Sequence, residues 1–179
     1  MKYLTEESLE KYLNLISSNW IKNQSVPNYE NKRLKPDYRN ENIKVIVEFN
    51  GYSHYCNPKQ IIRDYKKTKD FMNLGYKVIS IPYFIQMETE VIKQVFYKCG
   101  MLPCTLHVEQ EYPHGFIDKK CILPAEFCEL GIIRFKYEID KVFSWKLIRD
   151  EIILSLRNKI QEFGNINCVL PPSLHYLLD

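Results

Sequence analysis

The chain has 179 residues, 45% of them hydrophobic and 26% charged, a balance typical of a globular protein with one main domain. Lys and Arg (25) exceed Asp and Glu (22) by only three, which excludes a protein that coats nucleic acid through a large overall charge. No stretch has the length and apolarity of a membrane span, and the first residues lack the apolar core of a secretory signal. We therefore expect a cytoplasmic protein with no membrane partner.

The cysteines are spread along the chain without the density of a disulfide framework, and we interpret them as reduced thiols. They are Cys56, Cys99, Cys104, Cys121, Cys128 and Cys168. A zinc ion would need Cys99, Cys104 and His107 together with Cys56 or His114. That spacing is not a zinc knuckle or ribbon pattern, so free thiols are favoured over structural zinc.

The first predicted elements are a helix and a hairpin. Apolar residues recur at spacings of three and four over residues 5–21, and Thr5 is placed to cap that helix. Two strands are predicted at 34–39 and 44–50, joined by a turn at 40–43. Within the second strand, the run Val45-Ile46-Val47-Glu48-Phe49 is apolar on both faces except at Glu48. A carboxylate at that position needs a chemical reason.

A helix follows from Asn57, its predicted N-cap, to Gly75, with Pro58 in the first turn. We expect its apolar side chains to face inward and its cationic ones to lie on the opposite side. The apolar set is Ile61, Ile62, Tyr65, Phe71, Met72 and Leu74, and the cationic set is Lys59, Arg63, Lys66 and Lys67. A strand at 77–83 and a short helix at 89–99 complete residues 1–100. This order predicts an α/β fold with a mixed β-sheet flanked by helices.

Residues 101–179 are broken by several prolines and form a separate, smaller segment in our interpretation. One or two helical turns are predicted at 124–130, ended by Gly131, with a strand at 132–137. The clearest element is a helix from Trp145 to Phe163, between Ser144 and Gly164. We expect a mostly helical C-terminal segment that completes the fold or provides DNA recognition or a dimer contact.

The run Lys35-Pro36-Asp37-Tyr38-Arg39, followed by Val47-Glu48-Phe49-Asn50-Gly51, resembles the active-site hairpin of PD-(D/E)xK nucleases. The resemblance spans roughly residues 34–83. The continuation through His54 looks most like the very-short-patch-repair-like branch of that superfamily. The resemblance implies a restriction-endonuclease-like core and a deoxyribonuclease that uses Mg²⁺, for which Mn²⁺ can substitute.

Side-chain alternation gives a physical reason for the acidic pair. In a hairpin that turns at 40–43, Asp37 is expected opposite about residue 46, and Glu48 two positions further on the same face. Two half-buried carboxylates repel each other unless a cation lies between them, and Mg²⁺ prefers such ligands. A metal there would activate water and polarise a phosphate. The resemblance adds the backbone carbonyl of Phe49 as a ligand, and Glu10 or Glu6 as a further carboxylate.

The chain departs from the family motif at one catalytic position, because Asn50 stands where the family has lysine. Asparagine can orient a water molecule but cannot supply a cation. His54, Lys44 or a lysine on the following helix could compensate, and we favour His54. The predicted catalytic residues are therefore Asp37, Glu48, Asn50 and His54.

The cationic set on the helix has two interpretations, contact with DNA phosphates and a solvated helix face. The function predicted from the sequence is a metal-dependent DNA endonuclease of a restriction, repair or mobile-element type. Cutting both strands would favour a homodimer. One alternative is a catalytically inactive nucleic-acid-binding module with a nuclease fold. Another is a protein-interaction domain in the C-terminal half.

Overall fold

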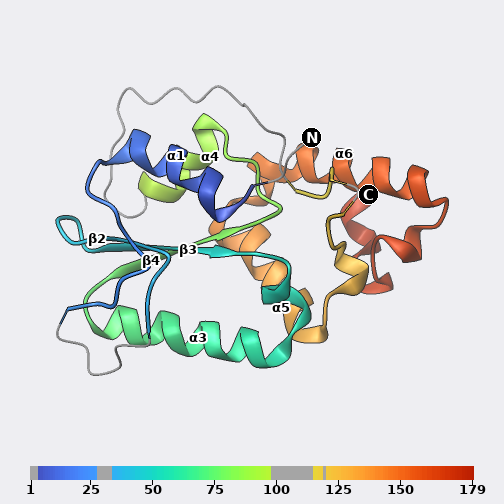
Figure 1. The fold of residues 1–179 in the computed structure, drawn as a ribbon. Helices are drawn as coiled ribbons and strands as arrows, with labels where there is room; N and C mark the ends of the chain where they lie inside the picture. The colour runs from blue at the N-terminus through green and yellow to red at the C-terminus, as the bar shows by residue number, and fades with distance from the viewer. Residues whose placement is uncertain (1–3, 28–33, 98–114, 119) are drawn as a thin grey trace.

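The structure is a computed structural model, which describes residues 4–27, 34–97, 115–118 and 120–179. A four-stranded mixed sheet flanked by helices forms its centre, which confirms the predicted α/β class (Figure 1). The strands are β1 (Ile21–Lys22), β2 (Tyr38–Asn40), β3 (Val45–Asn50) and β4 (Lys77–Pro82), in the order β1-β2-β3-β4. β2 pairs antiparallel with β1 and β3, whereas β3 and β4 are parallel.

Helices cover both faces of the sheet (Figure 1). Helices α1 (Glu6–Ile16) and α4 (Thr89–Tyr97) lie on one face, and α3 (Pro58–Asn73) lies on the other. Along β3, Val45 and Val47 pack with α1 and α4, whereas Ile46 packs with Phe71 of α3. Because strand side chains alternate, Glu48 and Asn50 share the α3 side with Ile46.

Helix α1 begins as predicted but ends earlier. The side chain of Thr5 accepts the backbone N–H of Ser8, and the hydroxyl of Ser8 accepts that of Thr5, which forms a capping box. The helix ends at Ile16, and the Trp20 indole N–H donates to the carbonyl of Leu13 at 2.8 Å. The chain then forms the short edge strand β1, which the helical periodicity did not predict.

Helix α3 has the predicted start, but the face predicted to be buried is wrong. The Asn57 side chain caps it, Pro58 is its first residue, and Gly75 after it has φ +85°. Phe71 is fully buried, but Tyr65 is 77% exposed. Ile62 and Met72 are exposed as well. Asp64 and Lys67, whose contacts are described below, are half-buried on the inward side of the helix.

The regular elements described after residue 115 are all helical. They are η1 (Pro124–Glu126), α5 (Glu129–Tyr137), η2 (Glu138–Val142), α6 (Trp145–Phe163), η3 (Ile166–Cys168) and η4 (Pro172–Leu178). Helix α6 has the predicted limits, with Gly164 at φ +67° after its last turn. The strand predicted at 132–137 is wrong, because α5 continues through Gly131. A Cβ atom on Gly131 would lie 1.8 Å from the carbonyl oxygen of Tyr55, so this glycine permits close helix packing.

One hydrophobic core joins the sheet to the C-terminal segment. Tyr55, on the short helix α2 (Ser53–Cys56), stacks on Phe127 with ring centroids 5.0 Å apart. Phe84, after β4, contacts Phe135 of α5 at the same centroid distance. These rings attach α5 to the end of the sheet where β3 leads into α2 (Figure 1). No helix in the described residues is long and apolar enough to cross a membrane.

Candidate active site

Asp37 and Glu48 meet on the α3 side of the β2–β3 hairpin. Tyr38 pairs with Val47 and Arg39 with Ile46, so the same register sets Asp37 opposite Glu48. The sequence had placed Asp37 opposite about residue 46, which is wrong by two positions. Residues directly opposite each other share one face of a sheet, so the corrected register brings the two carboxyl groups closer than predicted.

The Asp37 carboxylate also organises the backbone of the facing strand. Its Oδ2 accepts the N–H of Phe49 at 2.7 Å, and the carbonyl of Asp37 accepts the N–H of Asn23 at 3.0 Å. In an extended strand the N–H and C=O of one residue point to the same side, so the Phe49 carbonyl faces the Asp37 strand too. The register sets Pro36 opposite Phe49, and proline has no N–H to donate. The Phe49 carbonyl therefore lacks its ladder donor and suits a metal ligand.

Lys67 of α3 forms an ion pair with Glu48. The Lys67 Nζ lies 2.6 Å from Glu48 Oε2, with these side chains 21% and 13% exposed. Glu48 Oε1 is buried and has no hydrogen-bond partner among the described residues. Burial first, and then the charge of Asp37, raises the pKa of Glu48 to about 7, although Lys67 opposes this shift. The site thus holds one carboxylate oxygen that is out of water and without a donor.

Asn50 lies on the same face as Glu48, two positions along β3. It is buried, and its Nδ2 has no hydrogen-bond partner among the residues that the structure covers. A buried amide without a partner is costly, which makes this nitrogen a candidate donor to a water or phosphate oxygen.

His54 of α2 is held by Asp64 of α3. The His54 Nδ1 lies 2.6 Å from Asp64 Oδ2, which also accepts from Arg134 Nη1 at 2.8 Å. Asp64 Oδ1 accepts from Gln60 Nε2 at 2.8 Å. Burial raises the pKa of Asp64, but the hydrogen bonds and charges of His54 and Arg134 outweigh it, so the pKa is lowered. An ionised carboxylate only accepts, so Nδ1 donates, and in the neutral ring Nε2 keeps its lone pair.

The charge of His54 also acts on Asp37. Burial raises the pKa of Asp37, and the charge of Glu6 adds to this, whereas Phe49, Lys67 and His54 lower it. Glu6 of α1 is thus one of the charges that act on Asp37. Glu10, the predicted additional metal ligand, instead pairs with Lys22 at 2.9 Å. In the described parts of the chain, no group of three or more His, Cys, Asp or Glu side chains is arranged to hold a metal ion.

The predicted cationic set on α3 divides into two parts. Lys59, Arg63 and Lys66 are exposed on α3, whereas Lys67 turns towards Glu48. Lys44, one of the predicted substitutes for the motif lysine, pairs with Glu41 at 2.8 Å. The cation that reaches the acidic pair is therefore the helix lysine.

The residues considered for a zinc site, which the sequence analysis disfavoured, lie mostly outside the described ranges. Cys99, Cys104, His107 and His114 lie outside the described ranges. Cys56 is a free thiol, as are Cys121, Cys128 and Cys168.

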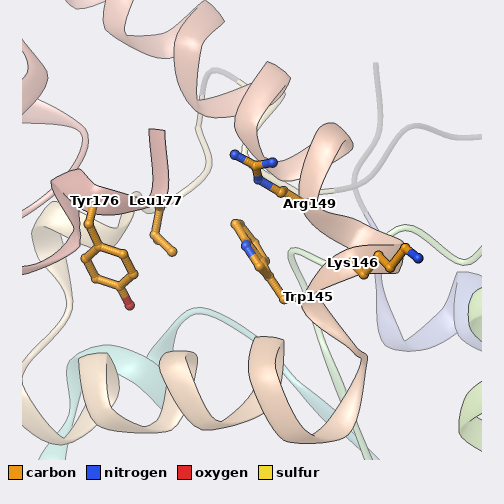
Figure 2. A pocket seen from close by; sticks show the side chains of 5 residues that line it. All are labelled: Trp145, Lys146, Arg149, Tyr176 and Leu177. Atoms are coloured by element: carbon orange, nitrogen blue, oxygen red, sulfur yellow. The ribbon is translucent and has the colours of Figure 1, made fainter. Parts of the chain in front are cut away.

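A cavity of about 320 Å³ lies in the C-terminal segment. Trp145, Lys146 and Arg149 of α6 line it, together with Tyr176 and Leu177 of η4 (Figure 2). Aromatic rings and cations suit contact with nucleobases and phosphates. No carboxylate or imidazole is among these lining side chains.

Sequence reasoning missed the residues that support His54. Asp64 is the only acidic residue between Lys59 and Lys69, which was a local sign that it has a specific role. Arg134 Nε pairs with Glu138 Oε1 at 2.9 Å, an i,i+4 contact that only a helix allows. Because residues 132–137 were predicted to form a strand, this helical ion pair was not expected.

The assembled site offers two carboxylates, a free backbone carbonyl, an ammonium group and an imidazole held by a carboxylate. Such a set can bind a divalent cation, move a proton and stabilise negative charge on a phosphate. No protein family, curated protein or solved structure matches this chain. Its function must therefore be argued from the geometry of these side chains.

Proposed function

We propose that this chain is a magnesium-dependent endonuclease that hydrolyses DNA phosphodiester bonds, with a restriction-endonuclease-like core. The observation that carries this proposal is the meeting of Asp37, Glu48 and Lys67 on one side of a hairpin. The lysine arrives from α3 instead of from the strand position that Asn50 occupies.

The residues present fit a hard divalent cation. Asp37, the buried Oε1 of Glu48 and the carbonyl of Phe49 are oxygen ligands, and Mg²⁺ takes few protein ligands alongside waters and phosphate oxygens. When bound, the ion would supply Lewis-acid polarisation of the phosphate and a more acidic water. Lys67 pairs with Oε2 of Glu48, which leaves Oε1 for the ion.

The remaining side chains have roles in handling charge and protons. Lys67 places an ammonium group where negative charge develops on the phosphate. His54 accepts a proton from water at Nε2, while Asp64 holds Nδ1 and fixes the tautomer. Asn50 donates from Nδ2 to orient the water. The exposed Lys59, Arg63 and Lys66 contact DNA phosphates outside the reacting centre.

Cleavage of supercoiled plasmid in Mg²⁺, in Mn²⁺ and in EDTA tests this proposal. We expect cleavage in both metals, no cleavage in EDTA, and a loss of about 100-fold or more in Asp37→Asn because a proposed metal ligand is removed. Glu10→Gln is the matched control, because Glu10 pairs with Lys22 and not with the site. Calorimetry should show weaker Mg²⁺ binding to Asp37→Asn. Wild-type rates of cutting by Asp37→Asn would refute the assignment.

A second candidate is a nucleic-acid-binding module without turnover. The Lys67–Glu48 ion pair favours it, because the lysine already balances Glu48 without a metal. Tight DNA binding in EDTA, with no cutting in either metal, would support this candidate. Substituting Lys59 and Arg63 with Gln should then weaken binding and reduce its salt dependence.

A further inference from the structure

A continuous set of polar contacts runs from His54 into α5. Arg134 Nη1 donates to Asp64 Oδ2 at 2.8 Å and to the carbonyl of His54 at 3.3 Å. One guanidinium therefore touches both the backbone of the histidine and the carboxylate that holds its ring. These contacts join positions 80 and 70 residues apart, from α5 to α2 and α3.

Arg134 is itself fixed on its other sides. Its Nε donates to Glu138 Oε1 at 2.9 Å, and the Tyr55 hydroxyl donates to Glu138 Oε2 at 2.6 Å. The guanidinium carbon lies 5.1 Å from the centre of the Tyr55 ring. The Arg134 side chain is 15% exposed and that of Glu138 is 5% exposed. Charges this well buried and hydrogen-bonded have few alternative rotamers.

The packing of α5 on α2 brings Arg134 within reach. Gly131 lies so close to the Tyr55 carbonyl that a Cβ would overlap it. The same carbonyl accepts the backbone N–H of Cys128 at 3.1 Å. Arg134 follows Gly131 by three residues, so it lies on the same side of α5. The close approach at Gly131 and the contact at Asp64 are therefore parts of one interface.

We propose that Arg134 is a positioning residue that acts through Asp64 to hold the imidazole of His54 towards the Asp37–Glu48 pair. The C-terminal segment thereby completes the active site. This inference rests on the proposed function. Without the guanidinium, Asp64 loses a charged partner on the oxygen that holds the ring, and the ring can turn away. Partners in this outer layer commonly change activity by about 10- to 100-fold.

The first test compares plasmid cleavage by Arg134→Gln, Arg134→Lys and the control Lys141→Gln. Lys141 also lies in the C-terminal segment, is 67% exposed and pairs only with Asp140 among the contacts described. We expect kcat to fall about 10- to 100-fold in Arg134→Gln with KM unchanged. Arg134→Lys should restore part of the loss, and Lys141→Gln should match the wild type. Arg134→Gln could unfold because Glu138 loses its cation. In that case the double variant Arg134→Gln/Glu138→Gln, which removes both charges together, is used instead of the single variant.

The second test follows the ring nitrogens of His54 by ¹⁵N NMR, assigned with His54→Gln, and does not depend on cleavage. In the wild type we expect a protonated, hydrogen-bonded Nδ1, and in Arg134→Gln a signal that moves towards a mixture of tautomers. A changed signal in a protein that never cuts DNA would refute the proposed function and leave the positioning role intact. An unchanged His54 signal, or wild-type kcat in a cutting enzyme, would overturn the role of Arg134.

Discussion

The ammonium nitrogen of Lys67 lies 2.6 Å from Oε2 of Glu48, across 19 residues of chain that include the whole first half of α3. This pair explains how a carboxylate is tolerated within the apolar run from Val45 to Phe49 of β3. A buried charge is stabilised when an opposite charge is held against it, and α3 brings that charge to β3. The pair also gives the site a cation despite Asn50.

Replacing Lys67 with Gln should reduce kcat for plasmid cleavage by about 100-fold or more, because a preorganised charge near the phosphate is lost. Lys66→Gln is the matched control, since Lys66 is exposed on the same turn of α3. It should weaken DNA binding slightly and leave kcat unchanged. Equal losses in both variants would show that the two lysines only attract DNA.

The ionisation of Glu48 should make the stability of the protein depend on pH. Its pKa rises from 4.5 to about 7 on folding, so between these values the folded state binds a proton that the unfolded state has lost. The contribution of this shift to the free energy of unfolding is therefore fully present below pH 4.5. It is lost as pH rises through 7, at up to about 1.4 kcal/mol per pH unit.

Urea unfolding at pH 5.5 and pH 8 measures this effect, with Glu48→Gln as the reference. Relative to the wild type, the free energy of unfolding of Glu48→Gln should be higher at pH 8 than at pH 5.5. Added Mg²⁺ should stabilise the wild type more at pH 8 than at pH 5.5, because the ion competes with the proton for the carboxylate. A difference independent of pH would contradict the assigned shift.

Substituting Gly131 with Ala should destabilise the fold, although alanine is the better helix former. In an open helix this change is stabilising by about 1 kcal/mol. Here the added Cβ would lie 1.8 Å from the Tyr55 carbonyl oxygen, and backbone must move. We expect a loss of about 1–3 kcal/mol in urea unfolding. Ile133→Ala, at an exposed position of α5, should change stability by less than about 0.5 kcal/mol.

The observed orientation of α3 can be checked with two aromatic residues. Phe71→Ala should cost about 3–5 kcal/mol, because Phe71 is fully buried against Ile46. Tyr65→Ser should cost less than about 0.5 kcal/mol, because Tyr65 is 77% exposed. Chemical denaturation of both variants measures the difference. Comparable losses of stability in the two variants would contradict the observed orientation of α3 and support the one predicted from the sequence.

Local patterns were sufficient for several elements and for the acidic pair. The caps at Thr5 and Asn57 and the limits of α6 follow from residues next to them in sequence. Asp37 and Glu48 could be placed on one face because side chains alternate along strands, even though the exact register was missed. A pattern with a short repeat needs no knowledge of the rest of the fold.

The remaining features depend on contacts that local periodicity does not contain. Helix α3 turns Asp64 and Lys67 inward because His54, Arg134 and Glu48 offer partners, and this outweighs burying Ile62 or Tyr65. The partner of Asp64 is 70 residues away. From the local sequence, Gly131 was predicted to end a helix. Its role is instead set by the carbonyl of Tyr55, a contact that no neighbour in sequence indicates.

The separation of 80 residues between His54 and Arg134 has a consequence for synthesis. A ribosome releases the chain from its N-terminus, so the hairpin and α3 emerge well before the arginine is added. If Arg134 orients the imidazole as proposed, a nascent or prematurely terminated product carries the Asp37–Glu48 hairpin but lacks the arginine that positions His54. The proposed activity would then develop only as translation nears completion.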